Sequence, residues 1–343
     1  MNKFNEKKWF IGVDISKDTL DLSLLCEESY GAFEDLQLKN SLKGFTKIKK
    51  WLGKQGRKPE DCAFCMEHTG TYGLLFFAWL ETNGLLFCVE PGLQIKRSLG
   101  MTRGKTDKID ARRIADYLYC NKAKLRAFQM PSDTIIKIKQ LLAYREQMVR
   151  IKIGLNNSLR SHQQYEKLSG LRNITKELSA QRAGQVERIA QIEKEIESVI
   201  EKEAELKKNY GLARSVCGIG LVTTAFMLVT TNNFSSFESG REYACYAGIA
   251  PFEYSSGRSI KTRNKVSHLG HRKVKALLAN GANSAANWDP QIRAYYSRKA
   301  KEGKDHKLII NAISCKLVNR VFAVIRRQTP YVKVYEHNFG NIG

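Results

Sequence analysis

Residues 9–16 read WFIGVDIS and residues 20–26 read LDLSLLC, two short apolar runs separated by the turn residues Asp18 and Thr19. Apolar runs of this length on either side of a short polar turn predict a β-hairpin. Asp14 lies inside the first run, where a carboxylate costs several kcal/mol unless it is paired or binds a metal ion. The hairpin therefore predicts the beginning of a sheet and marks Asp14 as a functional residue.

The segments that follow the hairpin alternate between strand and helix patterns. They predict, in chain order, an edge strand, an amphipathic helix, a buried strand, a second helix and a second buried strand: residues 32–39, 42–52, 62–67, 72–81 and 85–89. Asn83 and Gly84 are typical of the end of a helix. Together with the hairpin, this alternation predicts a mixed α/β domain over residues 1–130.

Residues 131–210 differ in character from this first domain. Glycine becomes rare, and charged residues interleave with apolar ones. Steps of three and four residues separate the apolar side chains of one seam, in which Glu203 is the polar exception: Ile189, Ile192, Ile196, Val199 and Leu206. We expect a long helical hairpin that turns near Ser169 and Gly170. Two interpretations stay open, a spacer that packs on its own chain and a coiled-coil arm that joins protomers.

The chain is strongly basic, with 57 Lys and Arg against 34 Asp and Glu and a formal net charge of +23. Such charge favours nucleic acid, because each neutralised phosphate releases counterions and adds affinity. Residues 251–343 alone hold 18 Lys and Arg against 5 Asp and Glu. Within them one stretch has basic residues and no acid, and it predicts a nucleic-acid surface rather than a solvated face: Arg258, Lys261, Arg263, Lys265, Arg272, Lys273 and Lys275.

Membrane, secreted and zinc-binding proteins are each disfavoured. No uncharged apolar run reaches about 18 residues, and the polar start at residues 2–8 precedes no signal-peptide core. The eight cysteines lack the spacing of a disulfide framework, and Cys62 and Cys65 lack a second pair of zinc ligands. We expect a soluble protein of the cytoplasm, associated with the nucleoid and not with a membrane.

Four carboxylates occur in an order that suits a ribonuclease-H-like sheet: Asp14, Glu67, Asp107 and Asp110. Glu67 ends a predicted central strand, and Asp107 and Asp110 share one face at the start of a predicted helix over residues 108–120. Carboxylates brought together repel one another, and a hard divalent cation relieves this repulsion. Taken singly, Asp107 also suits a helix N-cap, Asp110 a first-turn acid and Glu67 a surface residue at a strand end.

Four motifs along the chain resemble those of one family, the DEDD transposases of the insertion-sequence-one-ten type, described as bridge-RNA-guided serine recombinases. The motifs are Gly12-Val13-Asp14-Ile15-Ser16-Lys17, Glu67-His68-Thr69-Gly70-Thr71-Tyr72, Lys105-Thr106-Asp107-Lys108-Ile109-Asp110-Ala111, and Gly248-Ile249-Ala250-Pro251 through Ser255-Ser256-Gly257. Each motif alone is a weak signal. Four in order, with a helical spacer between the third and the fourth, form a specific one.

The resemblance implies an architecture and a set of partners. It implies an α/β ribonuclease-H-like (RuvC-like) catalytic domain at residues 1–130, a long α-helical coiled-coil spacer at 131–210 and a mostly α C-terminal transposase domain at 211–343. It also implies Mg²⁺, with Mn²⁺ as an alternative, bound by the four carboxylates. The implied partners are double-stranded donor and target DNA, a structured noncoding guide RNA and further copies of the chain, from a dimer to a tetramer.

The function implied is that of a transposase or recombinase of a bacterial insertion sequence, in which a serine joins covalently to DNA. Ser256 is the expected nucleophile because the family places serine directly before glycine, although Ser255 is its neighbour. The main alternative is a RuvC-like, metal-dependent, structure-specific nuclease that uses water. A nucleic-acid scaffold and a sugar-kinase-like ATPase are weaker alternatives, since the first leaves Asp14 unexplained and the second needs phosphate-binding glycine loops.

Overall fold

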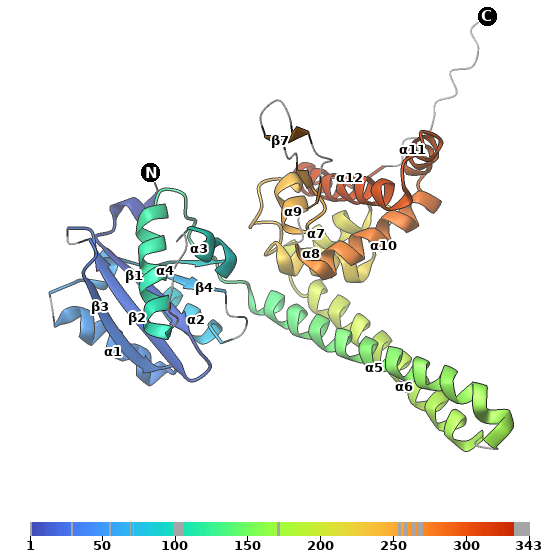
Figure 1. Cartoon of the computed structure of the whole chain (residues 1–343), viewed down its shortest axis with the longest axis horizontal. Coiled ribbons are helices and arrows are strands. Elements are labelled where there is room, and N and C mark those ends of the chain that lie inside the picture. The colour runs from blue at the N-terminus through green and yellow to red at the C-terminus, as the bar shows by residue number, and fades with distance from the viewer. Residues whose placement is uncertain are drawn as a thin grey trace, which may run out of the picture. The chain divides into compact units, whose positions relative to one another are not determined.

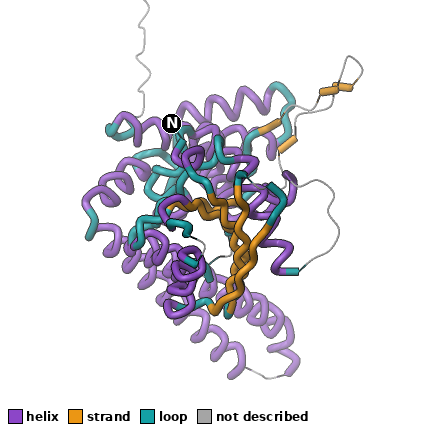
Figure 2. The backbone as a smooth tube through the Cα atoms, turned by 90° about the vertical axis from the view of Figure 1, so that its left-hand side faces the viewer, coloured by secondary structure: helices purple, strands orange, loops and turns teal. Residues whose placement is uncertain are grey.

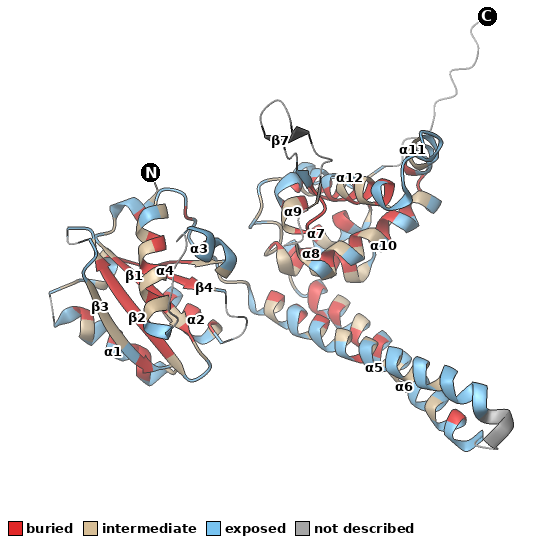
Figure 3. Cartoon of the chain, viewed as in Figure 1, coloured by how far each residue is buried: buried red, intermediate tan, exposed pale blue. Residues whose placement is uncertain are grey.

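The computed structural model describes residues 2–28, 30–54, 56–68, 70, 72–98, 106–169, 172–252, 255–256, 260–261, 265–266 and 270–332. The chain divides into two compact units, residues 1–130 and 131–343. Each unit has hydrophobic cores of its own (Figure 3).

The first unit is built on a mixed sheet of five strands in the order β3-β2-β1-β4-β5. The strands are β1 (Trp9–Ile15), β2 (Thr19–Cys26), β3 (Phe33–Lys39), β4 (Cys62–Glu67) and β5 (Leu86–Glu90). The first three pair antiparallel, whereas β4 pairs parallel with both β1 and β5. The predicted hairpin, the edge strand and both buried strands are therefore present, and the sheet fits a ribonuclease-H-like domain.

Helices cover both faces of this sheet (Figure 1). Alternate side chains of the strands enter two separate cores. Beneath α1 (Leu42–Gly53) and α2 (Leu74–Thr82) lie residues such as Ile11 and Val13. Phe10 lies in the other core, beneath α4 (Asp107–Asn121). Burial on both faces explains why the central strands read as nearly continuous apolar runs. The short helices η1 (Lys3–Glu6), η2 (Pro59–Asp61) and α3 (Gly92–Ser98) complete the unit.

Gly12 lets α4 lie directly on β1. A Cβ atom at this position would stand 2.1 Å from the carbonyl oxygen of Ala111 and 2.2 Å from the amide nitrogen of Ala115. Both are backbone atoms of α4, which side-chain rotation cannot move away. The absence of a side chain at Gly12 therefore determines how closely the second turn of α4 approaches β1.

The second unit begins with two long helices, α5 (Asp133–Ser169) and α6 (Arg172–Glu201). They pack side by side as the predicted hairpin, with Ile138, Ile192 and Ile196 in their shared core. Figure 3 shows burial concentrated at one end of the pair, while the end near the turn is largely exposed. The prediction that this pair is a coiled coil joining protomers stays a prediction.

The predicted seam does not continue along one helix. The spacing of apolar residues placed Glu203 and Leu206 in the same run as Ile189, but α6 ends at Glu201. Glu203 takes the N-cap position of a new helix, α7 (Ala204–Arg214), in an extended backbone conformation. Leu206 is nevertheless buried in the same core as Ile189, because α7 folds back onto α6. Spacing alone cannot reveal such a break when the apolar period persists across it.

The remainder of the second unit is mostly helical, as expected, and its strands are short (Figure 2). Its helices are α8 (Leu221–Thr230), α9 (Gly240–Tyr246), α10 (Arg272–Trp288), α11 (Pro290–Lys301) and α12 (His306–Arg327). Helix α12 alone among the described helices is long and apolar enough to cross a membrane, but half of its apolar window is buried in the protein. Residues of α12 such as Ile313 and Val321 are fully buried in the core of this unit.

Candidate active site

The strand register places three acidic residues at one end of the sheet. Asp14 on β1 is the register partner of Asp21 on β2, and directly opposed residues of antiparallel strands point to the same face. Glu67 on β4 follows Met66, which is the register partner of Val13, so it comes next to Asp14 in the adjacent strand. By alternation these side chains share the face on which Phe10 and Gly12 meet α4.

Helix α4 supplies two more carboxylates from its first turn, those of Asp107 and Asp110. Thr106 is the N-cap residue, and its Oγ1 atom accepts a hydrogen bond of 3.2 Å from the amide of Ile109. The alternative assignment of Asp107 as the N-cap is therefore wrong, because Asp107 is already helical. Asp110 accepts a hydrogen bond of 3.0 Å from Nη1 of Arg113, one turn further along the helix.

The carboxylate of Asp14 is surrounded by the other acids. Its pKa is raised to about 6, first by burial and then by the negative charges of four neighbouring carboxylates: Asp107, Asp110, Asp21 and Glu67. Charges act in this way only over short distances. The structure therefore brings the other three predicted carboxylates within electrostatic range of Asp14, and it adds Asp21 as a further neighbour.

The side chains of this acidic cluster do not converge on one point. Among the described residues, no three His, Cys, Asp or Glu side chains stand close enough together to hold a metal ion as they are placed. The donors are nevertheless all carboxylate oxygens, which suit Mg²⁺ or Mn²⁺, and Asp side chains change direction by simple rotation about χ1. Moreover, Oδ2 of Asp21 is buried without a hydrogen-bond partner in the described part of the chain. The donor set thus fits a hard divalent cation.

A zinc site at Cys62 and Cys65 is not supported. Cys62 lies in the core beneath α1 and α2, whereas Cys65 lies in the core beneath α4. The two thiols point to opposite faces of the sheet and cannot share one ion. Burial raises the pKa of Cys62 to about 12, as expected for an inert, protonated core thiol.

Gly92 at the start of α3 leaves room for the side chain of Glu67. A Cβ atom at Gly92 would lie 1.8 Å from Oε1 of Glu67, closer than any non-bonded contact allows. Sequence reasoning did not identify this residue. Its position directly after Pro91, beyond the end of a predicted strand, was the available signal for a turn at the sheet edge.

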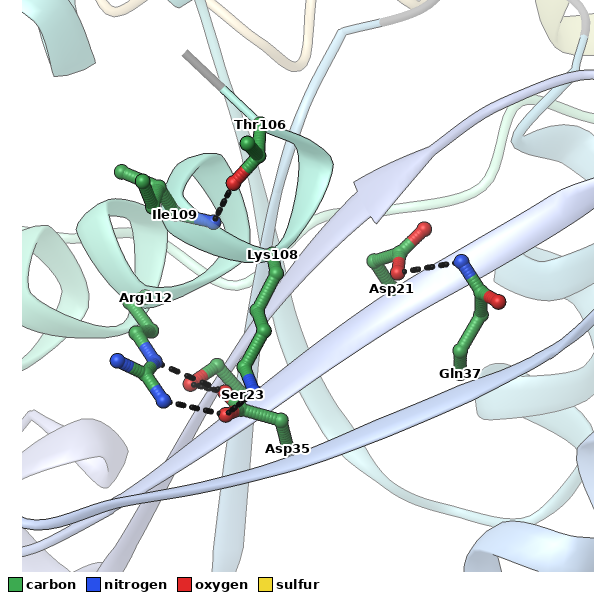
Figure 4. Close-up of polar contacts among 8 residues, drawn as sticks. All are labelled: Asp21, Ser23, Asp35, Gln37, Thr106, Lys108, Ile109 and Arg112. Carbon is green, nitrogen blue, oxygen red and sulfur yellow. Dashed lines mark hydrogen bonds and ion pairs between the residues drawn. The ribbon is translucent and has the colours of Figure 1, made fainter. Parts of the chain in front are cut away.

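Asp35 on β3 ties α4 to the sheet beside the acidic cluster (Figure 4). It accepts hydrogen bonds from Ser23 Oγ at 2.9 Å and from Arg112 at 3.1 and 2.5 Å, and it pairs with Lys108 Nζ at 2.9 Å. Burial acts to raise the pKa of Asp35, but these donors outweigh it and hold the pKa at about 2. This ionic contact fixes the helix that carries Asp107 and Asp110. No sequence pattern predicts this contact, because the residues that form it lie on three separate elements, β2, β3 and α4.

The expected nucleophile lies in a short hairpin of the second unit. Strand β7 (Ser255–Ser256) pairs antiparallel with β8 (Ile260–Lys261), so that Ser256 is the register partner of Ile260. A neighbouring pair joins β6 (Pro251–Phe252) to β9 (Lys265–Val266). The predicted nucleic-acid residues Arg258 and Arg263 lie outside the described residues. Lys261 and Lys265 are placed by their backbone in β8 and β9.

The other three predicted nucleic-acid residues, Arg272, Lys273 and Lys275, lie in the first turn of α10. The expectation that this basic stretch lacks counter-acids is wrong for Lys273. Its Nζ atom is 2.6 Å from Oε1 of Glu146 on α5. An acid remote in sequence can be adjacent after folding, so counting charges along the chain overestimated the free positive charge here.

Comparison with known proteins places the chain in a family. A model of DEDD transposases of the IS110 type, described as "Transposase", matches residues 11–165, and a model described as "Transposase IS116/IS110/IS902 family" matches residues 210–297. The chain belongs to the IS110 family of transposases. It is therefore a transposase or recombinase enzyme that acts on DNA. The first match contains Asp14, Glu67, Asp107 and Asp110, and the second contains Ser256.

Individual proteins and a solved structure are also similar to this chain. The "Pilin gene-inverting protein" of Moraxella bovis is 29% identical over 330 residues, covering 95% of this chain and 98% of that protein. The "Insertion element IS110 uncharacterized 43.6 kDa protein" of Streptomyces coelicolor is 34% identical over 117 residues, covering 34% of this chain and 29% of that protein. T. thermophilus RuvC in complex with a Holliday junction substrate matches with 11% identity and a TM-score of 0.27, covering 35% of this chain and 99% of that one.

Proposed function

We propose that this transposase cuts and rejoins DNA strands in a divalent-metal-dependent reaction at the carboxylates around Asp14, with Ser256 as the covalent nucleophile. In this assignment residues 1–130 form the RuvC-like catalytic domain, residues 131–210 the coiled-coil spacer and residues 211–343 the transposase domain. The observation that carries the proposal is the convergence of carboxylates from β2, β4 and α4 on Asp14, whose pKa is raised to about 6 by burial and by these neighbouring charges. Such clustered acids are costly to a fold that has no use for them.

The metal site comprises the four predicted carboxylates: Asp14, Glu67, Asp107 and Asp110. A bound Mg²⁺ or Mn²⁺ would supply Lewis-acid stabilisation of the phosphoryl group and of the leaving oxygen. Gly12 and Asp35 keep the carboxylates of α4 at the end of β1, and Gly92 admits the side chain of Glu67. The protein thus supplies a set of negative oxygens and the scaffold that holds the elements carrying them.

Ser256 would carry the DNA between the two halves of the reaction. Its Oγ attacks a DNA phosphorus, and the bond from that phosphorus to a deoxyribose oxygen breaks. The proton lost by the serine hydroxyl ends on this oxygen, which leaves as a hydroxyl group. The hydroxyl of a new strand then attacks the phosphoserine and releases the serine. Because a phosphoester replaces a phosphoester at each step, no ATP is needed.

A second candidate function is that of a metal-dependent nuclease in which water replaces the serine. The structure gives it one argument, since all of the clustered carboxylates belong to the first unit, whereas Ser256 belongs to the second. Water would discard the energy of the phosphoester, so such an enzyme cuts DNA without rejoining it. Capture of a covalent protein–DNA complex separates the two functions.

We further propose that the protein acts in the cytoplasm as a dimer to tetramer, joined through the hairpin of α5 and α6. Ile151 and Ile153 on α5 are 41% and 50% exposed, large apolar side chains that a lone helical pair leaves in water. Tyr165, Ile174 and Val186 extend this exposed apolar set along both helices. Such residues support contact with further copies of the chain.

A structured noncoding RNA completes the proposal, as a guide that pairs with donor and target DNA. Support comes from the net charge of +23, which suits a protein that holds more than one polyanion. The test is to purify the full chain from cells that carry its element, digest separate samples with ribonuclease and deoxyribonuclease, and sequence what is protected. We expect one structured RNA encoded next to the gene. Protein that carries only DNA, or random RNA fragments, would contradict guidance by RNA.

The basic hairpin segment is expected to bind phosphates. Four of its residues are neutralised in the test variant: Arg258, Lys261, Arg263 and Lys265. DNA binding should weaken, and the plot of log K against log[salt] should become less steep by roughly 3 to 4, because each phosphate contact contributes about 0.9 to the steepness. Fluorescence anisotropy with labelled duplex DNA at several salt concentrations measures this slope. Lys273 is left intact, since it is already paired with Glu146.

The matched control for this variant neutralises four exposed lysines of α1: Lys43, Lys47, Lys49 and Lys50. It changes the net charge by the same amount at a different place. Equal slopes in the two variants would show that the hairpin segment is only a solvated basic face.

A further inference from the structure

Asp21 is an acidic residue of the sheet that is not one of the four predicted carboxylates. It lies on β2 between two register partners on the neighbouring strands, Asp14 on β1 and Gln37 on β3. Its side chain therefore emerges on the same face as that of Asp14. Only 6% of Asp21 is exposed, and it is the one acidic residue among the buried polar residues of the first unit's described part.

The two carboxylate oxygens of Asp21 have different surroundings (Figure 4). Nε2 of Gln37 donates a hydrogen bond of 2.9 Å to Oδ1. Oδ2 is buried and has no hydrogen-bond partner in the described part of the chain. A buried carboxylate oxygen that lacks a partner costs free energy, and native proteins keep few of them without a reason.

Neighbouring acids on the same face have hydrogen-bond donors, unlike Oδ2 of Asp21. Asp35, on the same strand as Gln37, receives bonds on both oxygens from Ser23, Arg112 and Lys108. Glu90 on β5 accepts a hydrogen bond from the Tyr117 hydroxyl at 3.3 Å.

We propose that Asp21 is a fifth carboxylate of the Asp14 site, in which Oδ2 serves as a ligand for the divalent cation while Gln37 holds Oδ1 in place. The inference rests on the proposed metal-dependent function. Directly opposed residues of antiparallel strands have Cβ atoms about 4.5–5.5 Å apart. Two aspartates at that spacing can each place an oxygen on one cation, with metal–oxygen distances of about 2.0–2.1 Å for Mg²⁺.

Gln37 then has the role that hydrogen-bond donors commonly have behind a metal ligand. By fixing Oδ1, it restricts rotation of the carboxylate and leaves Oδ2 as the oxygen available to the ion. The sequence carried a signal for Asp21 of the same kind as for Asp14, since both are single acids within an apolar strand. Only the register shows that the two are partners.

The test is Mn²⁺ binding to the full chain without DNA, followed by electron paramagnetic resonance of the free ion. Asp21→Asn removes the charge but keeps an acceptor for Gln37, and we expect it to weaken Mn²⁺ binding about tenfold or more. The control Asp18→Asn removes the same charge from the exposed turn of the same hairpin and should bind as the parent does. Parent-like affinity in Asp21→Asn overturns the proposal.

The same titration separates this inference from the proposed function. If neither the parent nor Asp18→Asn binds Mn²⁺, the metal site itself is wrong. If the parent binds and Asp14→Asn does not, while Asp21→Asn is unaffected, the metal site stands and only the role of Asp21 is wrong.

Thermal unfolding provides a readout that does not depend on ion affinity. In EDTA, Asp21→Asn should melt at the same temperature as the parent or higher, because it removes an unpaired buried charge beside Asp14. Added Mn²⁺ should raise its melting temperature less than that of the parent. A lower melting temperature in EDTA would show that Asp21 stabilises the fold by itself, and would overturn its assignment as a ligand.

Discussion

Asp14→Asn is expected to abolish DNA strand transfer, with a loss of about a thousandfold or more, which corresponds to ~4 kcal/mol of transition-state stabilisation. Asp14 is the residue on which the other carboxylates converge, and the amide removes both its charge and one of its two oxygen ligands. Binding of DNA or RNA should change little, because the basic residues that we expect to contact phosphate are elsewhere in the chain. Gel-based strand transfer with Mg²⁺, beside anisotropy for binding, measures both quantities.

Asp18→Asn is the control for this experiment, since it removes the same charge from the exposed turn after β1 and should retain strand transfer. Full activity of Asp14→Asn would remove the carboxylate site from the mechanism. Activity of the parent in EDTA would do the same for the metal.

Asp14→Asn should also change how the stability of the metal-free protein depends on pH. The pKa of Asp14 is about 6 in the folded chain against 3.8 for the free side chain, so the folded state holds the proton more tightly than the unfolded state does. Stability in EDTA therefore falls as the pH rises from about 4 to about 6, and stays at the lower value above that range. In Asp14→Asn this contribution is absent, and urea unfolding at pH 4.5 and pH 7 compares the two proteins.

Ser256→Ala is expected to eliminate any covalent protein–DNA complex and to reduce strand exchange to background. The alanine removes the only atom through which residue 256 can bond to phosphorus. Labelled donor or target DNA, together with the RNA that copurifies with the protein, is incubated with the enzyme and separated by denaturing electrophoresis. A DNA band that migrates with the protein is expected from the parent and from Ser255→Ala, but not from Ser256→Ala.

Ser255→Ala is a close control, because it changes the adjacent residue of the same two-residue strand, β7. Loss of the covalent band in Ser255→Ala alone would move the nucleophile by one residue. If both variants cut DNA as the parent does and no covalent band forms in any of them, the water-using nuclease is the correct function.

Local sequence patterns by themselves determined most of the first unit. The apolar runs of β1, β2 and β4 predicted their strands because a strand buried on both faces of a sheet is apolar along most of its length. The same rule made Asp14 conspicuous, and the spacing of Asp107 and Asp110 placed them on one turn of a helix. The family motifs required no tertiary contact to be recognised, since each is a short continuous segment.

The tertiary structure decided which of these residues meet and what holds them together. The pairing of Asp14 with Asp21 depends on strand register, and the approach of α4 to Gly12 depends on packing between segments about a hundred residues apart in the chain. The ion pair of Lys273 with Glu146 and the break of the helical seam before Leu206 are likewise set by neighbours remote in sequence. Sequence patterns report the period and polarity of one segment, whereas a site depends on distances between segments, and those distances exist only once the chain has folded.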